Sequence, residues 1–253
     1  MKVSVITVVK NDAPGLGLTY ANLVQQSLVD WELIIVVGES TDNTLGLAQE
    51  IQSKDIRVRL IKQLGKGIYP AMNDGLGATS GEFTWFMNAG DRFATKDVLN
   101  QALGELSRSN AAIVIGGYRV NNDSNGRVYS FSNKIVTARE FAFTRRGGCH
   151  QAMMFSTKVL RFVGGFDTTF SLASDFDLVL RVIKVARVVR VPEVYAVIEP
   201  GGRADQGIYV VHREKHKIRQ QILGGPFIFL SSLIWTLLAR IKISLRRFIV
   251  NFL

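Results

Sequence analysis

Residues 81–91, Gly-Glu-Phe-Thr-Trp-Phe-Met-Asn-Ala-Gly-Asp, place the strongest constraint on what this chain can fold into. Residues 83–87 form an apolar run of β-favouring residues that stops at a small polar turn, which predicts a short strand buried on both faces. Ligands of open α/β sheets bind just beyond the carboxyl ends of the strands. Asp91, the carboxylate in this turn, is therefore the first candidate to hold a metal ion or a phosphate-bound cation.

The rest of the chain repeats a strand–helix pattern around that turn. A regular alternation of this kind predicts an α/β fold with a doubly wound, mostly parallel sheet flanked by helices. Ser174 is the predicted N-cap of one of the later helices. The predicted strands are 3–9, 31–37, 58–62, 83–87, 111–118, 188–191 and 194–199, and the predicted helices are 16–26, 45–53, 97–106, 156–163 and 176–185.

Length and cysteine content bound the class of protein. A chain of 253 residues holds one large α/β domain or two small ones. The single cysteine, Cys149, excludes an internal disulfide framework and fits a reducing compartment. The apolar run at residues 3–9 is too short for a signal peptide, so we expect a cytoplasmic protein.

The positive charge is concentrated near the end of the chain. The net charge is +10, and residues 212–253 hold eight Lys or Arg against the single acid Glu214. The positive and negative charges of the preceding 211 residues nearly balance, which argues against a nucleic-acid-binding protein. The uncharged run 227–239 is shorter than the roughly 20 residues that a spanning helix needs. Residues 240–253 have apolar and basic side chains at helical spacing; they either pack on the core or attach to an anionic membrane surface, and the charge excess favours the membrane.

Five short motifs occur in an order that resembles a known enzyme family. They are Ile-Ile-Val-Val-Gly-Glu-Ser-Thr-Asp-Asn-Thr at 34–44, Lys-Gly-Ile-Tyr-Pro-Ala-Met-Asn at 66–73, Phe-Met-Asn-Ala-Gly-Asp at 86–91, His-Gln at 150–151, and Gly-Gly-Phe-Asp at 164–167 followed by Ser-Asp at 174–175. The chain resembles family 2 glycosyltransferases of the GT-A fold, and within them the small bacterial enzymes of exopolysaccharide and lipopolysaccharide assembly, of the colanic acid type. The resemblance covers residues 1–205 and implies a nucleotide-sugar-binding half at 1–92 and an acceptor half at 93–205. The charge and apolar spacing described above predict a membrane-associating helical tail at 206–253.

The resemblance implies a divalent cation, Mg²⁺ or Mn²⁺, with Asp91 as its ligand. Hard cations of this kind take carboxylate, phosphate and water oxygens. The family turn usually holds several aspartates, whereas this chain has Asn88, Ala89 and Gly90 there and one carboxylate remains. The other interpretation of Asp91 is a cap for the segment that follows.

The resemblance also implies a donor-side set. Relatives often hold the nucleotide base with an aspartate where this chain has Val37, which cannot accept that hydrogen bond. The backbone, Glu39 or Asp42 then reads the base, or the nucleotide differs; Asp42 is equally interpreted as a helix N-cap. Lys66 pairs with a phosphate or remains solvated. Tyr69 is expected to stack on or border the base or sugar. The full donor-side set is Thr7, Val9, Val37, Glu39, Asp42, Lys66, Tyr69, Asn73 and Asn88.

Asp175 matches the family's catalytic base. Inverting transfer needs one carboxylate to take the proton of the attacking acceptor hydroxyl, and a positioned base contributes about 10²–10⁴-fold in rate. An acid in the first turn of a helix is also stabilised by the helix dipole, and the two interpretations are compatible. His150, Gln151 and Arg203 are predicted on the acceptor and leaving-group side, with a purely structural histidine as the alternative.

The resulting hypothesis is an inverting, metal-dependent glycosyltransferase. It moves a sugar from a nucleotide-diphosphate sugar to a saccharide acceptor, lipid-linked, at the cytoplasmic face of the membrane. Two alternatives remain open: a non-catalytic nucleotide-sugar-binding relative, and a membrane-surface scaffold that uses the basic tail. A nucleotidyltransferase is disfavoured because the sequence lacks a Gly-rich triphosphate loop.

Overall fold

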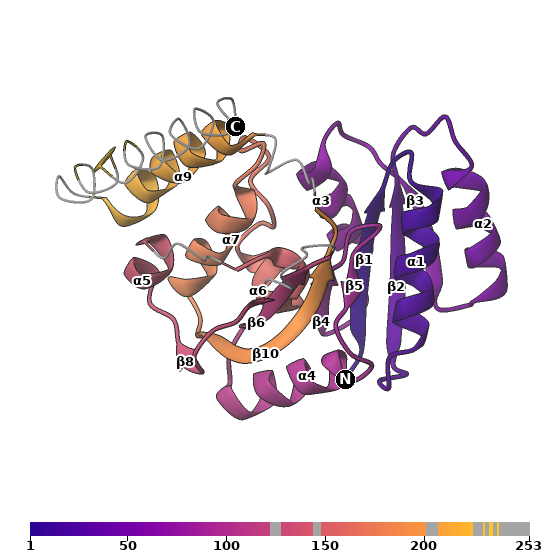
Figure 1. Cartoon of the computed structure of the whole chain (residues 1–253), viewed down its shortest axis with the longest axis horizontal. Coiled ribbons are helices and arrows are strands. Elements are labelled where there is room, and N and C mark those ends of the chain that lie inside the picture. Colours follow the sequence, from indigo (N-terminus) through magenta and orange to yellow (C-terminus); the bar gives the residue numbers. More distant parts are fainter. Residues whose placement is uncertain are drawn as a thin grey trace, which may run out of the picture.

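The computed structural model describes residues 1–121, 128–143, 148–200 and 207–224, together with residues 230, 233, 234 and 237. Figure 1 shows one sheet running through the molecule with helices on both faces. Strands in the amino-terminal half are β1 (Val3–Val9), β2 (Trp31–Val37), β3 (Val58–Lys62) and β4 (Phe83–Phe86), and its helices are α1 (Ala13–Val24), α2 (Thr44–Lys54) and α3 (Ile68–Ala78).

The first four strands form a parallel sheet in the order β3-β2-β1-β4. Every residue of β2 is buried, because the apolar sequence Trp-Glu-Leu-Ile-Ile-Val-Val supplies hydrophobic side chains to both faces. Helices α1 and α2 cover one face and α3 covers the other, and two hydrophobic clusters form against the two faces. Parallel strands all point the same way, so the ends of β1, β2 and β4 meet at one edge.

The second half continues the sheet with mixed strand directions. Strand β9 (Met153–Ser156) pairs antiparallel with β4 and with β6 (Ile113–Val120), and β10 (Val188–Ile198) runs parallel to β6. The short strands β5 (Arg92–Phe93), β7 (Val128–Tyr129) and β8 (Lys134–Ile135) pair antiparallel along its edges. The sheet is thus mixed, with parallel pairing among its long strands, and the predicted α/β class is confirmed.

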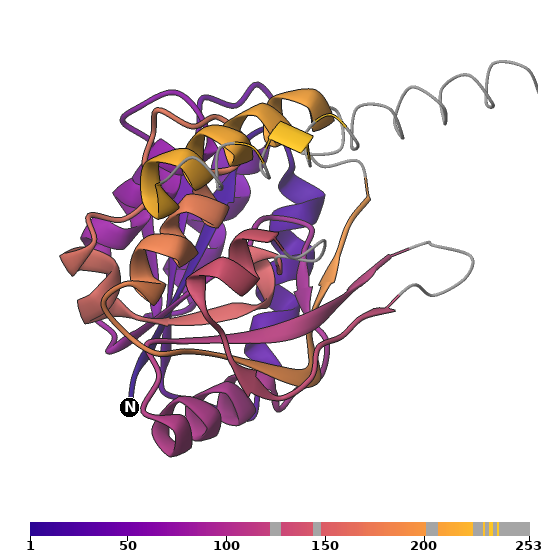
Figure 2. The same cartoon turned by 90° about the vertical axis from the view of Figure 1, so that its left-hand side faces the viewer.

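Helices of the second half hold the sheet on both sides. Helix α4 (Val98–Ser109) covers one face, and α5 (Ala138–Phe143), α6 (Thr157–Phe162) and α7 (Ser174–Ile183) cover the other, with the short 3₁₀ turn η1 (His150–Ala152) before β9. Helix α9 (Ile208–Leu223) packs over α7 and α5, as Figures 1 and 2 both show.

Three details differ from the sequence predictions. Helix α1 begins before residue 16, because the Asp12 carboxylate accepts the Gly15 amide at 2.9 Å and Pro14 fits the first turn. Ser174 is not the N-cap of α7: it is the first helical residue, and Ala173 occupies the cap position. The segments 188–191 and 194–199 join into one strand, β10, with register shifts around Pro192.

The tail prediction is only partly addressed by the described residues. Helix α9 is the first part of the predicted tail 206–253, and most of 225–253 lies outside the described residues. Within the described parts of the chain, no helix is long and apolar enough to cross a membrane.

Candidate active site

The turn after β4 carries Asp91 at the carboxyl edge of the sheet. Gly90 has a φ of +89°, a left-handed conformation that favours glycine, and its amide donates to the Gly15 carbonyl at 3.0 Å. The Thr19 hydroxyl donates to the backbone carbonyl of Asp91 at 2.8 Å. The turn is therefore fastened to α1, which fixes the direction of the Asp91 side chain.

The Asp91 carboxylate joins three elements of the fold. It is only 6% exposed, and it accepts the side-chain amide of Gln151 at 2.9 Å and the backbone amide of Glu199 at 3.0 Å. Gln151 is held in turn because its backbone carbonyl accepts the Trp85 indole N–H at 2.8 Å. Burial raises the pKa of Asp91, since desolvation disfavours the charged carboxylate.

His150 links this turn to the start of α7. Its Nε2 lies 3.2 Å from Asn88 Nδ2, and its Nδ1 lies 3.5 Å from Asp175 Oδ2. The Asn88 amide is a donor, so Nε2 accepts and the proton is assigned to Nδ1, facing Asp175. The imidazole is 9% exposed, which keeps it in this bridging position.

Asp175 combines a buried setting with access to solvent. Its side chain is 26% exposed, and Oδ1 accepts the Phe176 amide at 2.7 Å. Burial acts to raise the pKa of Asp175, but the hydrogen bond and electrostatic interaction with His150 and the positive charge of Lys215 outweigh it, so the pKa lies below its ordinary value. Asp175 is therefore a carboxylate at neutral pH and can accept a proton.

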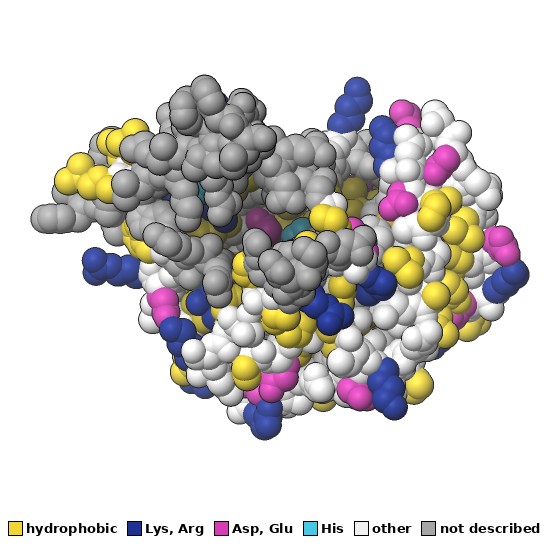
Figure 3. Space-filling model, in the orientation of Figure 1, with side chains coloured by type: hydrophobic (Ala, Val, Ile, Leu, Met, Phe, Trp, Pro, Cys, Tyr) yellow, Lys and Arg dark blue, Asp and Glu magenta, His cyan; other side chains and the backbone are white. Residues whose placement is uncertain are grey.

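Acidic and histidine side chains surface together near the centre of the face shown in Figure 3. The structure thus brings together five predicted site residues: Asn88, Asp91, His150, Gln151 and Asp175.

Two residues of the predicted donor-side set contact the loop 164–167. Tyr69 is 5% exposed and its ring stacks on Phe166 at 5.2 Å. Both ends of the Asn73 side-chain amide bind the Phe166 backbone, at 2.8 and 2.9 Å. These contacts hold the loop 164–167 against α3, and the contact of Tyr69 and Asn73 with the donor stays a prediction.

The remaining donor-side residues lie at the ends of β1 and β2 and in the loops beyond. Val9 and Val37 are paired in register and 5% exposed. Thr7 is fully buried, and its hydroxyl has no partner among the described residues. Asp42 binds the backbone amides of Ala13 and Thr44, but the N-cap position of α2 is occupied by Asn43 and not by Asp42. Glu39 and Lys66 are exposed, and Arg203 lies outside the described residues.

Sequence patterns missed Glu199 and Glu214. The Glu199 backbone binds Asp91, and the Glu199 carboxylate accepts from Arg92 at 3.1 Å and from Asn121 at 2.7 Å. Glu214 binds the loop before α7. The only feature of the sequence that sets Glu214 apart is that it is the one acid in a basic segment.

The donor chemistry of the Asn88–Asp91 turn fits a hard divalent cation. Asn88 Oδ1 is a buried oxygen with no hydrogen-bond partner among the described residues. Burial raises the pKa of the Asp91 carboxyl, and a nearby cation would lower that pKa again. In the described ranges, no group of three or more His, Cys, Asp or Glu residues is arranged to hold a metal. The protein would thus supply few of the ligands, and phosphate and water oxygens would supply the others, as is usual for Mg²⁺.

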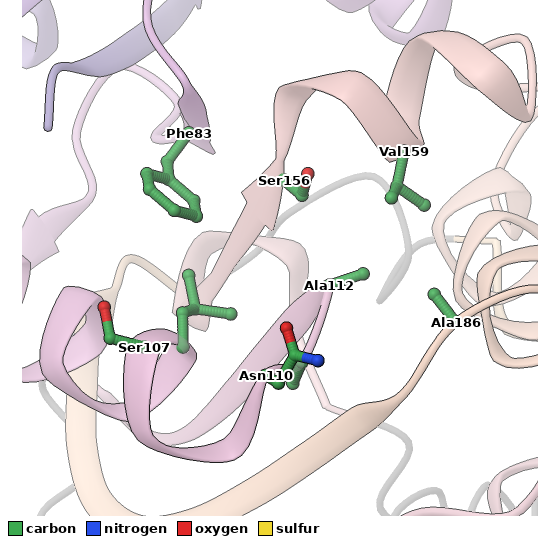
Figure 4. Close-up of a pocket in the computed structure, with 9 residues that line it drawn as sticks. Phe83, Ser107, Asn110, Ala112, Ser156, Val159 and Ala186 are labelled. Carbon is green, nitrogen blue, oxygen red and sulfur yellow. The ribbon is translucent and has the colours of Figure 1, made fainter.

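A hollow of about 380 Å³ opens at the opposite edge of the sheet, near the start of β4 and the end of β9. Figure 4 shows that Phe83, Asn110, Ser156 and Val159 point toward it. Its lining contains no titratable side chain, so it offers no acid or base for chemistry.

Solved structures share this arrangement of strands and helices. The Staphylococcus aureus protein TarS, residues 1–349 in complex with UDP-GlcNAc, superposes with a TM-score of 0.72 at 18% identity, over 92% of this chain and 72% of that chain. A mannosyltransferase from Pyrobaculum calidifontis in complex with GDP-Man and Mn²⁺ gives a TM-score of 0.70 at 18% identity, over 92% and 69% of the two chains. The likeness shows that the fold is GT-A-like.

Sequence comparison gives the family. An uncharacterised glycosyltransferase of Mycobacterium tuberculosis is 28% identical over 194 residues, which are 75% of this chain and 71% of the relative. A PGL/p-HBAD biosynthesis glycosyltransferase of Mycobacterium bovis is 27% identical over 183 residues, which are 70% of this chain and 68% of the relative. The profile of "Glycosyl transferase family 2" matches residues 4–164, and the chain belongs to this family.

Proposed function

We propose that this protein is an inverting glycosyltransferase that moves a sugar from a nucleotide-diphosphate sugar to a saccharide acceptor, with Asp175 as general base. The observation that carries the proposal is the connection between Asp175 and the Asn88–Asp91 turn through the single side chain of His150. It sets an ionised, partly exposed carboxylate across from the turn where the donor diphosphate would bind. The UDP-GlcNAc and GDP-Man bound by the two structural relatives support a nucleotide-sugar donor.

At the anomeric carbon, the reaction forms one C–O bond and breaks another. The acceptor hydroxyl oxygen attacks the anomeric carbon, Asp175 takes the hydroxyl proton, and the nucleoside diphosphate leaves with the bonding electron pair. Attack opposite the leaving group inverts the configuration, so an α-linked donor gives a β-linked product. His150 orients the carboxylate through its Nδ1 proton.

Asp91 and the Asn88 amide oxygen would hold Mg²⁺ or Mn²⁺. The cation, when bound, supplies positive charge that stabilises the leaving diphosphate. Gln151 and the Glu199 backbone orient the Asp91 carboxylate by their N–H groups. Arg203 is proposed as a further positive charge toward the diphosphate.

We place the acceptor at the cytoplasmic membrane face, as a lipid-linked saccharide in assembly of a bacterial surface polysaccharide. The observation behind this placement is a set of exposed apolar side chains that follows α9 at helical spacing: Leu230, Leu233, Ile234 and Leu237, which are 36–55% exposed. Basic residues at 240–247 would face anionic lipid headgroups.

A donor-binding panel tests the proposal. The full chain is mixed with UDP-, GDP-, dTDP- and CMP-sugars, with and without Mn²⁺, and its melting temperature is measured. A ligand that binds only the native state raises that temperature by mass action. A rise with one nucleotide sugar, together with release of its nucleoside diphosphate over time, supports the enzyme. Binding without turnover across a panel of saccharide acceptors supports a non-catalytic nucleotide-sugar-binding protein instead.

A further inference from the structure

We infer that Glu214, in helix α9, is a positioning residue for the base Asp175, because its carboxylate fixes the loop from which α7 begins. The inference rests on the proposed glycosyl transfer at Asp175. It makes the first helix of the basic tail an element of the active site.

Four hydrogen bonds tie Glu214 to that loop. Oε1 accepts the amide and the hydroxyl of Ser171, both at 2.8 Å. Oε2 accepts the amides of Leu172 and Ala173, both at 2.9 Å. A carboxylate that binds the backbone amide of a cap residue satisfies one of the donors left without a partner at the start of a helix, as the acid of a capping box does. Here the acid comes from another helix, some 40 residues further along the chain.

Helix α7 has no cap of its own in this structure. Its cap residue is Ala173, whose side chain cannot accept a hydrogen bond, and Ser174 Oγ is buried without a partner among the described residues. The amides of Leu172 and Ala173 therefore depend on Glu214 for their side-chain acceptor. Asp175 follows two residues after Ala173, so a shift of the loop moves the base directly.

Helix α9 also contacts the residue that follows the base. Lys215 Nζ lies 5.0 Å from the centre of the Phe176 ring. Consecutive residues of α9 thus contact the loop before Asp175 and the residue after it, which makes a chance surface contact a poor explanation. Tyr69 adds a second anchor from α3, because its hydroxyl interacts with the backbone amides of Ser174 and Asp175.

The position of Glu214 predicts which kinetic constant it controls. It contacts the loop that precedes the base and, within the described residues, makes no hydrogen bond or ion pair with the Asn88–Asp91 turn, where the donor diphosphate would bind. A base displaced by a fraction of an ångström from its place in the transition state lowers kcat more than it weakens donor binding.

Steady-state kinetics of the full-length Glu214→Gln variant test this. Glutamine keeps the shape of the side chain but loses the charge and one strong acceptor. We expect kcat to fall at least about tenfold, with the donor KM within about twofold of wild type. Glu214→Asp, which keeps the carboxylate, should recover part of kcat. Arg213→Gln, an exposed neighbour on α9, is the matched control and should leave both constants unchanged. A folded Glu214→Gln protein with wild-type kcat, or with a raised KM alone, overturns the inference.

Hydrogen exchange in the wild-type chain gives a second measurement that needs no variant. The amides of residues 171–173 should exchange at least about tenfold more slowly than free loop amides, because Glu214 binds all three. Exchange at the rate of an open loop overturns the inference even if the glutamine variant does not fold. A wild-type chain that turns over no nucleotide sugar defeats the proposed function, and the exchange result still decides whether Glu214 holds the loop.

Discussion

His150 Nδ1 lies 3.5 Å from Asp175 Oδ2, although the two residues are 25 positions apart in the chain. The histidine comes from the turn before β9 and the aspartate from the first turn of α7. This contact connects the base to the Asn88–Asp91 turn and explains why Asp175 stays ionised in a largely buried position.

Replacing Asp175 with Asn should abolish most of the transfer activity while donor binding remains. The amide has no basic site for the acceptor proton, so kcat should fall by about 10²–10⁴-fold. The check is kcat from product formation alongside the melting-temperature shift with donor. Asp97→Asn, an acid at the start of α4 far from the site, is the control. Near-normal turnover of Asp175→Asn would remove Asp175 from the role of base.

Replacing His150 with Phe should lower kcat by about tenfold or more. The phenyl ring fills the space but cannot donate to the carboxylate, and a hydrogen bond to a charged group contributes about 1.5–3 kcal/mol. The measurement is kcat and donor KM in the folded variant. His216→Phe, which changes a histidine that contacts Gln220 and not Asp175, serves as the histidine control. Equal activity of His150→Phe and wild type would show that the contact with Asp175 has no catalytic consequence.

Replacing Asp91 with Asn should remove the metal-dependent part of donor binding. A neutral amide cannot offset the charge of a divalent cation, so Mn²⁺ should no longer increase the thermal shift produced by the donor. In the wild type, chelation by EDTA should produce the same loss. Asp74→Asn, which changes a carboxylate bound to the Leu64 amide, should retain the Mn²⁺ effect. A full Mn²⁺ effect in Asp91→Asn would place the cation elsewhere.

Glu32 should make folding stability depend on pH in the acid range. Hydrogen bonds hold its pKa at about 2 despite burial, against 4.5 for an ordinary glutamate. Because the pKa of Glu32 is lower in the folded state, its ionised carboxylate contributes fully to the free energy of unfolding above pH 4.5. That contribution is lost as the pH falls toward 2. The contribution is on the order of 2–3 kcal/mol. The donors are the Lys2 ammonium, the hydroxyls of Ser4 and Ser80, and the amides of Ser80 and Gly81.

Urea unfolding of Glu32→Gln between pH 2.5 and 7 checks this. The variant should be less stable than wild type at pH 7, and the difference should shrink as the pH falls. Glu82→Gln, an exposed neighbour, is the control. A constant difference between Glu32→Gln and wild type across this range would contradict the prediction.

A chain that ends at residue 224 should lose membrane attachment and keep donor hydrolysis. The truncation removes the exposed apolar residues Leu230, Leu233, Ile234 and Leu237 and the basic residues of 240–247, but leaves α9 and Glu214 in place. Co-sedimentation with vesicles that contain phosphatidylglycerol should fall to the level seen with neutral vesicles. Retained binding to the anionic vesicles would place the membrane contact on the body.

Several features could be predicted from residue patterns because they are local. The buried strands β1, β2 and β4 follow from continuous apolar runs, and the Asp91 turn follows from the glycine and polar residues that end β4. The acid at the start of α7 follows from helical spacing after a polar segment. These patterns depend on interactions between residues close in the chain, so a sequence records them directly.

Motif membership did not reveal what Asn73 and Tyr69 contact. Both lie in a segment that the resemblance placed on the donor side, and in the structure they hold backbone, at Phe166 and at the start of α7. An amide or a phenol side chain can contact a bound donor or hydrogen-bond to backbone equally well. The choice depended on which loop the packing of α3 brought within hydrogen-bond distance.

The sequence by itself determined the α/β class, the order of the main elements, the carboxylate in the turn after β4 and the acid at the head of α7. Tertiary structure alone decided that His150 joins that turn to Asp175, that Gln151 and Glu199 hold Asp91, and that Glu214 fastens the loop ahead of the base. The physical reason is one of range. Periodicity and caps follow from backbone geometry over a few residues, whereas these contacts join residues 25–108 positions apart, which meet only when the sheet and its helices have packed.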